Sequence, residues 1–138
     1  PEGLGALLAM RRALDDASLA PADVGYVNAH GTSTPGGDRV EARALGELFD
    51  ERLAGVAVSS TKSMIGHLTV AAGAVEAIVT ALSLRDGIVH PTLNQEVRDP
   101  ECGIDTVPEG ARRLDLRAAL SNSFAFGGQT ACLAFVRA

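Results

Sequence analysis

One stretch of the sequence, residues 59–84, constrains the fold more than any other. It contains the only lysine of the chain, Lys62, and one of the three histidines, His67. The apolar segment that follows carries a single ionic residue, Glu76, and is shorter than the roughly 20 apolar residues of a membrane-spanning helix. We therefore expect a buried helix over residues 69–84. A buried carboxylate requires a polar partner, which predicts a polar site formed by Lys62, His67 and Glu76.

Helical and strand-like patterns alternate before this stretch. Residues 3–18 predict an amphipathic helix, and residues 24–29 predict a short buried strand. The loop 30–37 is rich in hydroxyl groups and glycines. Asp38 and Glu41 follow it with the spacing of a capping box, which predicts that a second helix opens at Asp38.

The same order is repeated further along the chain. Residues 56–60 predict a second strand, and a loop leads from it into the apolar helix. The stretch 90–108 is expected to be a connection with short strands at most, while the apolar runs 118–124 and 131–137 predict a final hairpin. This alternation is typical of a single α/β domain with layers, in which sites gather at the carboxyl ends of strands.

Composition argues against several classes of function. A net charge of −5 leaves no basic patch for nucleic acid. Cys102 and Cys132 show neither metal-ligand spacing nor a disulfide framework, which favours a reduced cytoplasmic protein without a metal site. No signal peptide or membrane segment is expected. The absence of a Gly-x-Ser-x-Gly motif counts against a hydrolase.

Three motifs stand in order along the chain: Asn28-Ala-His-Gly-Thr-Ser-Thr-Pro35, Thr61-Lys-Ser-Met-Ile-Gly-His67 and Asn122-Ser-Phe-Ala-Phe-Gly-Gly128. Together they resemble the C-terminal part of a β-ketoacyl-acyl-carrier-protein synthase (ketosynthase) of the thiolase-like superfamily. The resemblance covers essentially the whole chain. It implies the C-terminal half of a thiolase-like α/β fold, with helix–sheet–helix layers, and a role in fatty acid or type II polyketide synthesis.

The resemblance implies a catalytic role for four residues. His30 and His67 match the two catalytic histidines, which bind the thioester oxygen of malonyl carrier protein as it becomes an enolate. Donors placed where negative charge develops are often the largest contribution to catalysis. Lys62 matches the active-site lysine, and Glu76 matches its buried partner. Such a pair must be mutually compensated because an unpaired buried charge is very costly.

The resemblance also implies binding residues. Thr32 and Thr34 match hydroxyls that bind the phosphopantetheine arm of the acyl carrier protein, which is the substrate carrier in a reaction without a bound cofactor. Phe126 matches the residue whose backbone N–H completes the oxyanion hole. Gly127 and Gly128 are expected to let this loop move as a gate.

The nucleophilic cysteine of the family belongs to an N-terminal half that this sequence does not contain. Cys102 lies in an acidic stretch, which raises a thiol pKa, and Cys132 lies in an apolar run, so neither replaces it. For the same reason a thiolase is not supported. We expect a Cys-bearing partner half, an acyl carrier protein and a dimeric or larger assembly. The chain is then a fragment, a processed product or one part of a split enzyme.

Two departures from the family pattern leave the acyl chain length and the pathway open. Thr69-Val70 stands where many relatives carry Leu-Gly, and Gln129-Thr130 where many carry Thr-Asn. The alternative to a catalytic role is a structural or chain-length-setting half of a heteromeric synthase, in which the histidines are vestigial.

Overall fold

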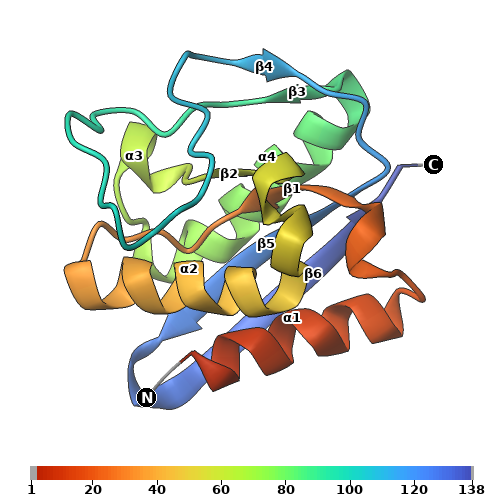
Figure 1. Cartoon of the computed structure of the whole chain (residues 1–138), viewed down its shortest axis with the longest axis horizontal. Helices are drawn as coiled ribbons and strands as arrows, with labels where there is room; N and C mark the ends of the chain where they lie inside the picture. Colours follow the sequence, from red (N-terminus) through yellow and green to blue (C-terminus); the bar gives the residue numbers. More distant parts are fainter. Residues whose placement is uncertain (1–2, 138) are drawn as a thin grey trace.

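A four-stranded sheet forms the centre of the computed structural model, which describes residues 3–137 (Figure 1). The sheet order is β2-β1-β5-β6, where the strands are β1 (Val24–Asn28), β2 (Ala57–Ser59), β5 (Ala118–Ala125) and β6 (Gln129–Val136). Strand β1 is parallel to both β2 and β5, and β6 returns antiparallel to β5. The predicted final hairpin is therefore present.

Helices cover both faces of the sheet. Helices α1 (Leu4–Asp16) and α2 (Pro35–Phe49) lie on one face, and α4 (Ala72–Asp86) lies on the other (Figure 1). The predicted layers of helix, sheet and helix are confirmed. The shorter elements are η1 (Pro21–Asp23), η2 (Asp50–Gly55), α3 (Lys62–Ile65), η3 (Thr69–Ala71), β3 (Ile88–Val89), β4 (Arg112–Arg113) and η4 (Phe126–Gly128). No helix within residues 3–137 has the length and apolar composition needed to cross a bilayer.

The core has two parts, one on each face of the sheet. The buried residues under α1 and α2 include Leu7, Met10, Leu45, Phe49 and Leu120. Those on the α4 side include Tyr26, Leu84, Val89 and Leu116. Because side chains alternate along a strand, β1 sends Val27 into the first part and Tyr26 into the second. Burial on both faces is typical of a central parallel strand. The loop after β1 begins where this buried strand ends, at Asn28.

The predicted start of the second helix is wrong. Helix α2 begins at Pro35 with Thr34 as the preceding cap residue, because proline suits the first helical position. Asp38 therefore lies in the first turn of α2, and no capping box forms with Glu41. The loop expected between the second strand and the apolar helix also contains one helical turn, α3. Strands β3 and β4 were not predicted because two residues are too few to show a periodicity.

Candidate active site

The three motifs meet at one edge of the sheet. His30 follows β1, Lys62 follows β2, and Phe124 lies near the end of β5. The carboxyl ends of these strands are neighbours because β1 is parallel to both of the others. The structure thus places residues from all three motifs at the edge where sites of α/β folds gather.

The rings of His30 and His67 lie next to each other. Their centroids are 5.6 Å apart, and the ring planes are nearly perpendicular, at 84°. The backbone N–H of Thr69 donates a hydrogen bond to Nδ1 of His67 at 3.1 Å. This contact assigns the proton of the neutral ring to Nε2, so that His67 can donate a hydrogen bond from Nε2. Thr69 reaches this position with a φ of 51°, which is unusual for a β-branched residue.

His30 is neutral near pH 7. Burial, together with smaller contributions from the charges of Lys62 and His67, lowers the pKa of His30 to about 4. A neutral imidazole has one donor and one acceptor nitrogen. The neutral ring of His30 can therefore offer one hydrogen bond to a developing oxyanion from its protonated nitrogen.

The structure is expected to lose stability as the pH falls from about 6.5 to about 4. The pKa of His30 is lowered from 6.5 to about 4 on folding, so the unfolded chain binds more protons in this window. The contribution of His30 to stability is therefore fully present above the unfolded pKa of 6.5. It is lost progressively as the pH falls towards the folded pKa of about 4. Urea unfolding at several pH values, for the wild type and for His30→Asn, measures this contribution. An identical pH slope in both proteins would contradict it.

Lys62 and Glu76 form a buried ion pair. The ammonium of Lys62 donates to Oε1 of Glu76 at 2.5 Å, and the side chains are 5% and 2% exposed. Oε2 of Glu76 has no hydrogen-bond partner within residues 3–137. The two residues are fourteen positions apart in the sequence and form the pair that the resemblance implied.

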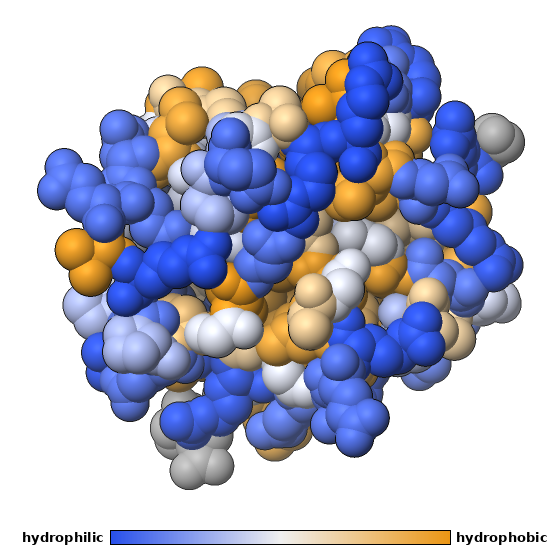
Figure 2. All heavy atoms as spheres, turned by 45° about the horizontal axis from the view of Figure 1, so that its top comes forward, coloured by the Kyte–Doolittle hydropathy of each residue, from blue (hydrophilic) through white to orange (hydrophobic). Residues whose placement is uncertain are grey.

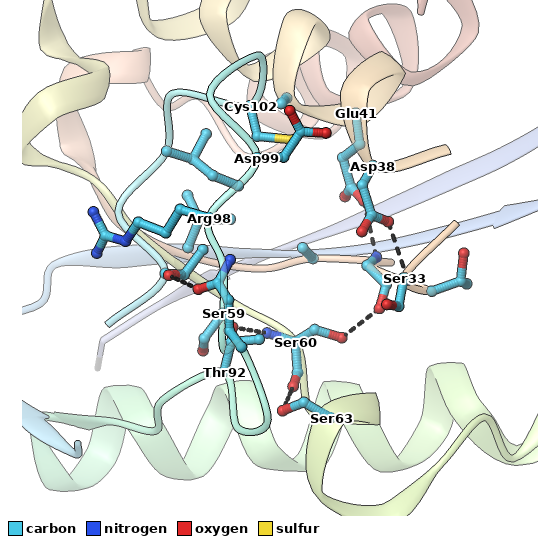
Figure 3. A pocket seen from close by; sticks show the side chains of 18 of the residues that line it. Ser33, Asp38, Glu41, Ser59, Ser60, Ser63, Thr92, Arg98, Asp99 and Cys102 are labelled. Atoms are coloured by element: carbon cyan, nitrogen blue, oxygen red, sulfur yellow. Dashed lines mark hydrogen bonds between the residues drawn. The ribbon is translucent and has the colours of Figure 1, made fainter. Parts of the chain in front are cut away.

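A cleft of about 1220 Å³ opens beside the pair, between α2 and the segment 92–106 (Figure 3). Lys62, His67 and Thr32 line it, whereas His30 and Thr34 are not among its lining residues. The hydroxyls of three cleft residues bond to backbone groups (Figure 3): Ser60 donates to the carbonyl of Gly31, Ser63 donates to the carbonyl of Ser60, and Thr92 accepts from the N–H of Ser60. A cleft of this size can hold an extended polar chain.

The cleft combines a polar rim with an apolar floor. Asp38, Arg98 and Asp99 belong to the rim, and Leu45 and Val58 are among its apolar lining residues. The face shown in Figure 2 is mostly hydrophilic, with hydrophobic residues visible between the polar ones. An apolar floor suits the methylene groups of a bound chain, while the rim can bind its amides.

The predicted binding residues lie on two loops. Oγ1 of Thr32 and Oγ1 of Thr34 are 3.2 Å apart. Phe126 lies at the turn between β5 and β6 with a fully exposed side chain. Gly127 and Gly128 both have a φ of 82°, in the region that favours glycine. Both positions of this turn therefore favour glycine, which is compatible with a plain hairpin turn and with a mobile gate.

Sequence reasoning missed Phe124. Its ring centroid lies 5.6 Å from that of His30, so the aromatic contact to the histidine pair comes from Phe124. The third motif contains both phenylalanines, but only Phe124 belongs to the strand β5, which pairs with β1. Its place on that strand is the signal that could have identified Phe124.

His90, the first residue of the predicted connection 90–108, belongs to a part-buried polar network. Its Nε2 lies 3.1 Å from the hydroxyl of Tyr26 and 3.0 Å from that of Thr61, and its Nδ1 lies 2.9 Å from the carbonyl of Pro91. A carbonyl only accepts, so Nδ1 carries the proton and Nε2 accepts. Burial lowers the pKa of His90. The network ties the strand β1 to the loop after β2.

Both cysteines have thiols of raised pKa. Burial raises the pKa of Cys102, with a further contribution from the charge of Asp99. Burial also raises the pKa of Cys132 to about 12. Because the thiolate is the nucleophilic form, neither residue is activated, as the sequence predicted.

The chain matches known proteins over almost its whole length. The model of the β-ketoacyl synthase C-terminal domain family matches residues 1–96. A 3-oxoacyl-[acyl-carrier-protein] synthase 2 of Staphylococcus aureus (strain COL) is 52% identical over 135 residues, which are 98% of this chain and 33% of the relative. The protein of the same name from Synechocystis sp. is 48% identical, over 98% of this chain and 32% of the relative.

Solved structures agree with these matches. One is a type II polyketide synthase acyl-carrier protein in complex with its ketosynthase bound to the hexaketide, with a TM-score of 0.93 and 34% identity over 99% of this chain and 33% of that chain. Another is a ketosynthase in complex with its chain length factor from Xenorhabdus doucetiae, with a TM-score of 0.82 and 33% identity over 100% of this chain and 34% of that chain.

The chain spans about one third of the length of the curated relatives it matches. The family match, the identity to these relatives and the three converging motifs all point to the same part of one fold. The chain belongs to the β-ketoacyl synthase family, in which it corresponds to the C-terminal domain.

Proposed function

We propose that this chain supplies the enolate-forming side of a ketosynthase active site. The reaction is the decarboxylative condensation of malonyl carrier protein with an acyl thioester. The observation that carries the proposal is the pair of neighbouring imidazoles, His30 and His67, next to a buried Lys62–Glu76 ion pair. Cleavage of the bond to the carboxylate releases carbon dioxide and leaves its electron pair on the thioester as an enolate.

The two histidines stabilise this enolate. Nε2 of His67 and one nitrogen of the neutral His30 ring donate to the thioester oxygen as it gains charge. The carbanion form then attacks the carbonyl of an acyl group held as a thioester on a cysteine of the partner half, and the thiolate leaves. A preorganised donor of this kind contributes roughly 10²–10³-fold to the rate.

The carrier arm reaches the site through the cleft. Thr32, which lines the cleft, and Thr34, whose hydroxyl lies 3.2 Å from that of Thr32, bind the phosphopantetheine. The backbone N–H of Phe126 stabilises the oxyanion formed at the acyl thioester. The left-handed Gly127 and Gly128 give the turn the freedom to open and close as a gate. We place the reaction in the reducing cytoplasm, which suits two free thiols.

The nucleophilic cysteine comes from a partner half, and helix α4 indicates where that half binds. Three of the five buried residues of α4 are polar, namely Glu76, Thr80 and Ser83. Its exposed side is apolar: Ile78 is 60% and Leu82 is 41% exposed. An isolated soluble domain favours the opposite arrangement. A partner that covers this face explains why α4 is apolar on its outer side.

A charge on the outer side of α4 is expected to weaken the assembly. Ile78→Asp places an unpaired carboxylate in the interface, which costs about 2 kcal/mol or more and so lowers the affinity about 30-fold or more. Titration calorimetry with the Cys-bearing half measures this change. Leu8→Asp on α1, on the other face of the sheet, is the control and is expected to leave the affinity unchanged. Equal affinities for all three proteins would contradict this interface.

The release of carbon dioxide from malonyl carrier protein tests the proposed function. The chain assembled with its Cys-bearing half is expected to decarboxylate the substrate far faster than that half alone. Equal decarboxylation rates with and without this chain would contradict the enolate-forming role. They would favour the structural or chain-length-setting alternative.

A further inference from the structure

We propose that Arg39 is a positioning residue, whose guanidinium holds the segment 96–103 against helix α2, so that this segment forms the outer wall of the cleft for the carrier arm. The segment 96–103 is called the strap below. The inference rests on the proposed function, because that function assigns the cleft to the carrier arm. It concerns residues that none of the three motifs contains.

The strap forms one side of the cleft. All of its residues except Glu101 line the cleft, and Ala42 of α2 is among the lining residues of the other side. Figure 3 shows Asp99 and Cys102 of the strap next to Asp38 of α2. The distance between the strap and α2 therefore sets the width of the cleft.

Backbone hydrogen bonds hold the longer segment 92–106 near its two ends. The backbone N–H of Thr92 donates to the carbonyl of Thr106 at 3.0 Å, which brings the two ends together. The backbone N–H of Val58 in β2 donates to the carbonyl of Asp105 at 2.8 Å. These bonds lie outside the strap, so they fix its ends without fixing its distance from α2.

Within residues 3–137, Arg39 is the one residue outside the strap that forms a hydrogen bond or ion pair with it. Nε of Arg39 donates to Oδ2 of Asp99 at 2.8 Å, and the guanidinium also pairs with the carboxylate of Glu101. The other hydrogen bonds of the strap are internal, because the backbone N–H groups of Glu101 and Cys102 donate to Asp99. One forked side chain therefore joins the strap to α2.

The other charged groups at this place are carboxylates, which repel one another. Burial raises the pKa of Asp38, and the charge of Asp99 acts in the same direction. The hydrogen bond from Arg39 lowers the pKa of Asp99. Without Arg39, the carboxylates of Asp99 and Glu101 would lie near that of Asp38 with no cation bound to them, and like charges at short range repel. The loss of Arg39 is therefore expected to move the strap away from α2.

The strength of the Arg39 contact allows the strap to open and close. One exposed ion pair changes an equilibrium constant by a factor of about five at most. Arg39 forms two, so its loss is expected to shift the ratio of closed to open strap by about 3- to 30-fold. If the arm needs the closed strap, its apparent affinity falls with the closed fraction. The strap forms no bond with His30 or His67, so the reaction of bound substrate is expected to stay unchanged.

Arg39→Met tests this role in the assembled synthase, because it removes the charge and keeps an unbranched side chain. We expect KM for malonyl carrier protein to rise about 3- to 10-fold and kcat to stay within about twofold of the wild type. Arg43→Met is the matched control. Arg43 lies one turn further along α2 at an exposed position and has no ion pair among residues 3–137. The control is expected to leave both constants unchanged.

Amide hydrogen exchange in the assembled synthase reports on the strap without depending on activity. The N–H groups of Glu101 and Cys102 are bonded to Asp99, so their exchange is slow while the turn of the strap is intact. We expect at least about threefold faster exchange in Arg39→Met, and the wild-type rate in Arg43→Met. Holo carrier protein is expected to slow this exchange in the wild type. Apo carrier protein, which lacks the phosphopantetheine arm, is expected to have no effect.

The outcomes separate this inference from the proposed function. If Glu101 and Cys102 exchange at the wild-type rate in Arg39→Met, Arg39 does not hold the strap, and the inference is overturned. If they exchange faster and KM is unchanged in an active synthase, the strap is not the wall of the arm's path, and the inference is also overturned. If the assembled synthase does not decarboxylate malonyl carrier protein, the proposed function fails. The difference between holo and apo carrier protein then decides whether the strap contacts the arm.

Discussion

Alanine in place of either His30 or His67 is expected to lower kcat for malonyl decarboxylation by about 10²–10³-fold, because each change removes one preorganised donor to the enolate oxygen. The ring centroids are 5.6 Å apart, so both side chains can reach one oxygen. Residues that act as a unit are strongly non-additive. The double variant is therefore expected to lose less than the product of the two single losses. Carbon dioxide release by the assembled synthase measures all three.

The third histidine provides the control. His90→Asn removes the remaining imidazole of the chain, which bonds to Tyr26 and Thr61 and not to the pair. Its kcat is expected to match that of the wild type, while its unfolding midpoint falls. Wild-type turnover in both His30→Ala and His67→Ala would instead mean that the pair is not catalytic.

Removal of one partner of the buried ion pair is expected to cost about 3–5 kcal/mol in the free energy of unfolding. Lys62→Met leaves the carboxylate of Glu76 buried and unpaired, and Glu76→Gln does the same to the ammonium of Lys62. The double variant Lys62→Met/Glu76→Gln has no buried charge at this place, so we expect it to be more stable than either single variant. Urea unfolding of the whole chain measures the three differences.

The exposed pair formed by Arg85 and Asp86 is the matched control for the buried one. Arg85→Met is expected to change the free energy of unfolding by at most about 1 kcal/mol, because water screens and solvates exposed charges. A double variant that is as unstable as the sum of the two single variants would show that Lys62 and Glu76 are not energetically coupled.

The position of the site could be predicted from the sequence because it depends on short-range patterns. Two repeats of strand, loop and helix place His30 and Lys62 after neighbouring strands, and parallel strands end at the same edge. The relation of His67 to the apolar helix was also predictable. The histidine precedes α4, and the turn at Thr69 with its positive φ separates the two. Within α4, Glu76 then points to Lys62.

The contacts that hold the site could not be predicted, because they join residues far apart in the sequence. Glu41 and Asn122 are 81 positions apart, and Tyr26 and His90 are 64 apart. A local rule even misled at one point. Asp38 and Glu41 have the spacing of a capping box, but Pro35 begins the helix three residues earlier. Glu41 therefore reaches the backbone of the loop before the helix, a partner that spacing alone does not reveal.

The burial of Lys62 has a consequence for the chemistry of the chain in the cell and in the laboratory. Lys62 carries the only ε-amino group of the sequence, and its side chain is 5% exposed and bonded to a carboxylate. Acylating reagents and enzymes that modify lysine need an accessible, uncharged amine. The Lys62 amine is inaccessible in the folded chain and becomes accessible when the chain unfolds around it. The extent to which this one side chain is modified therefore measures whether the segment around Lys62 is folded.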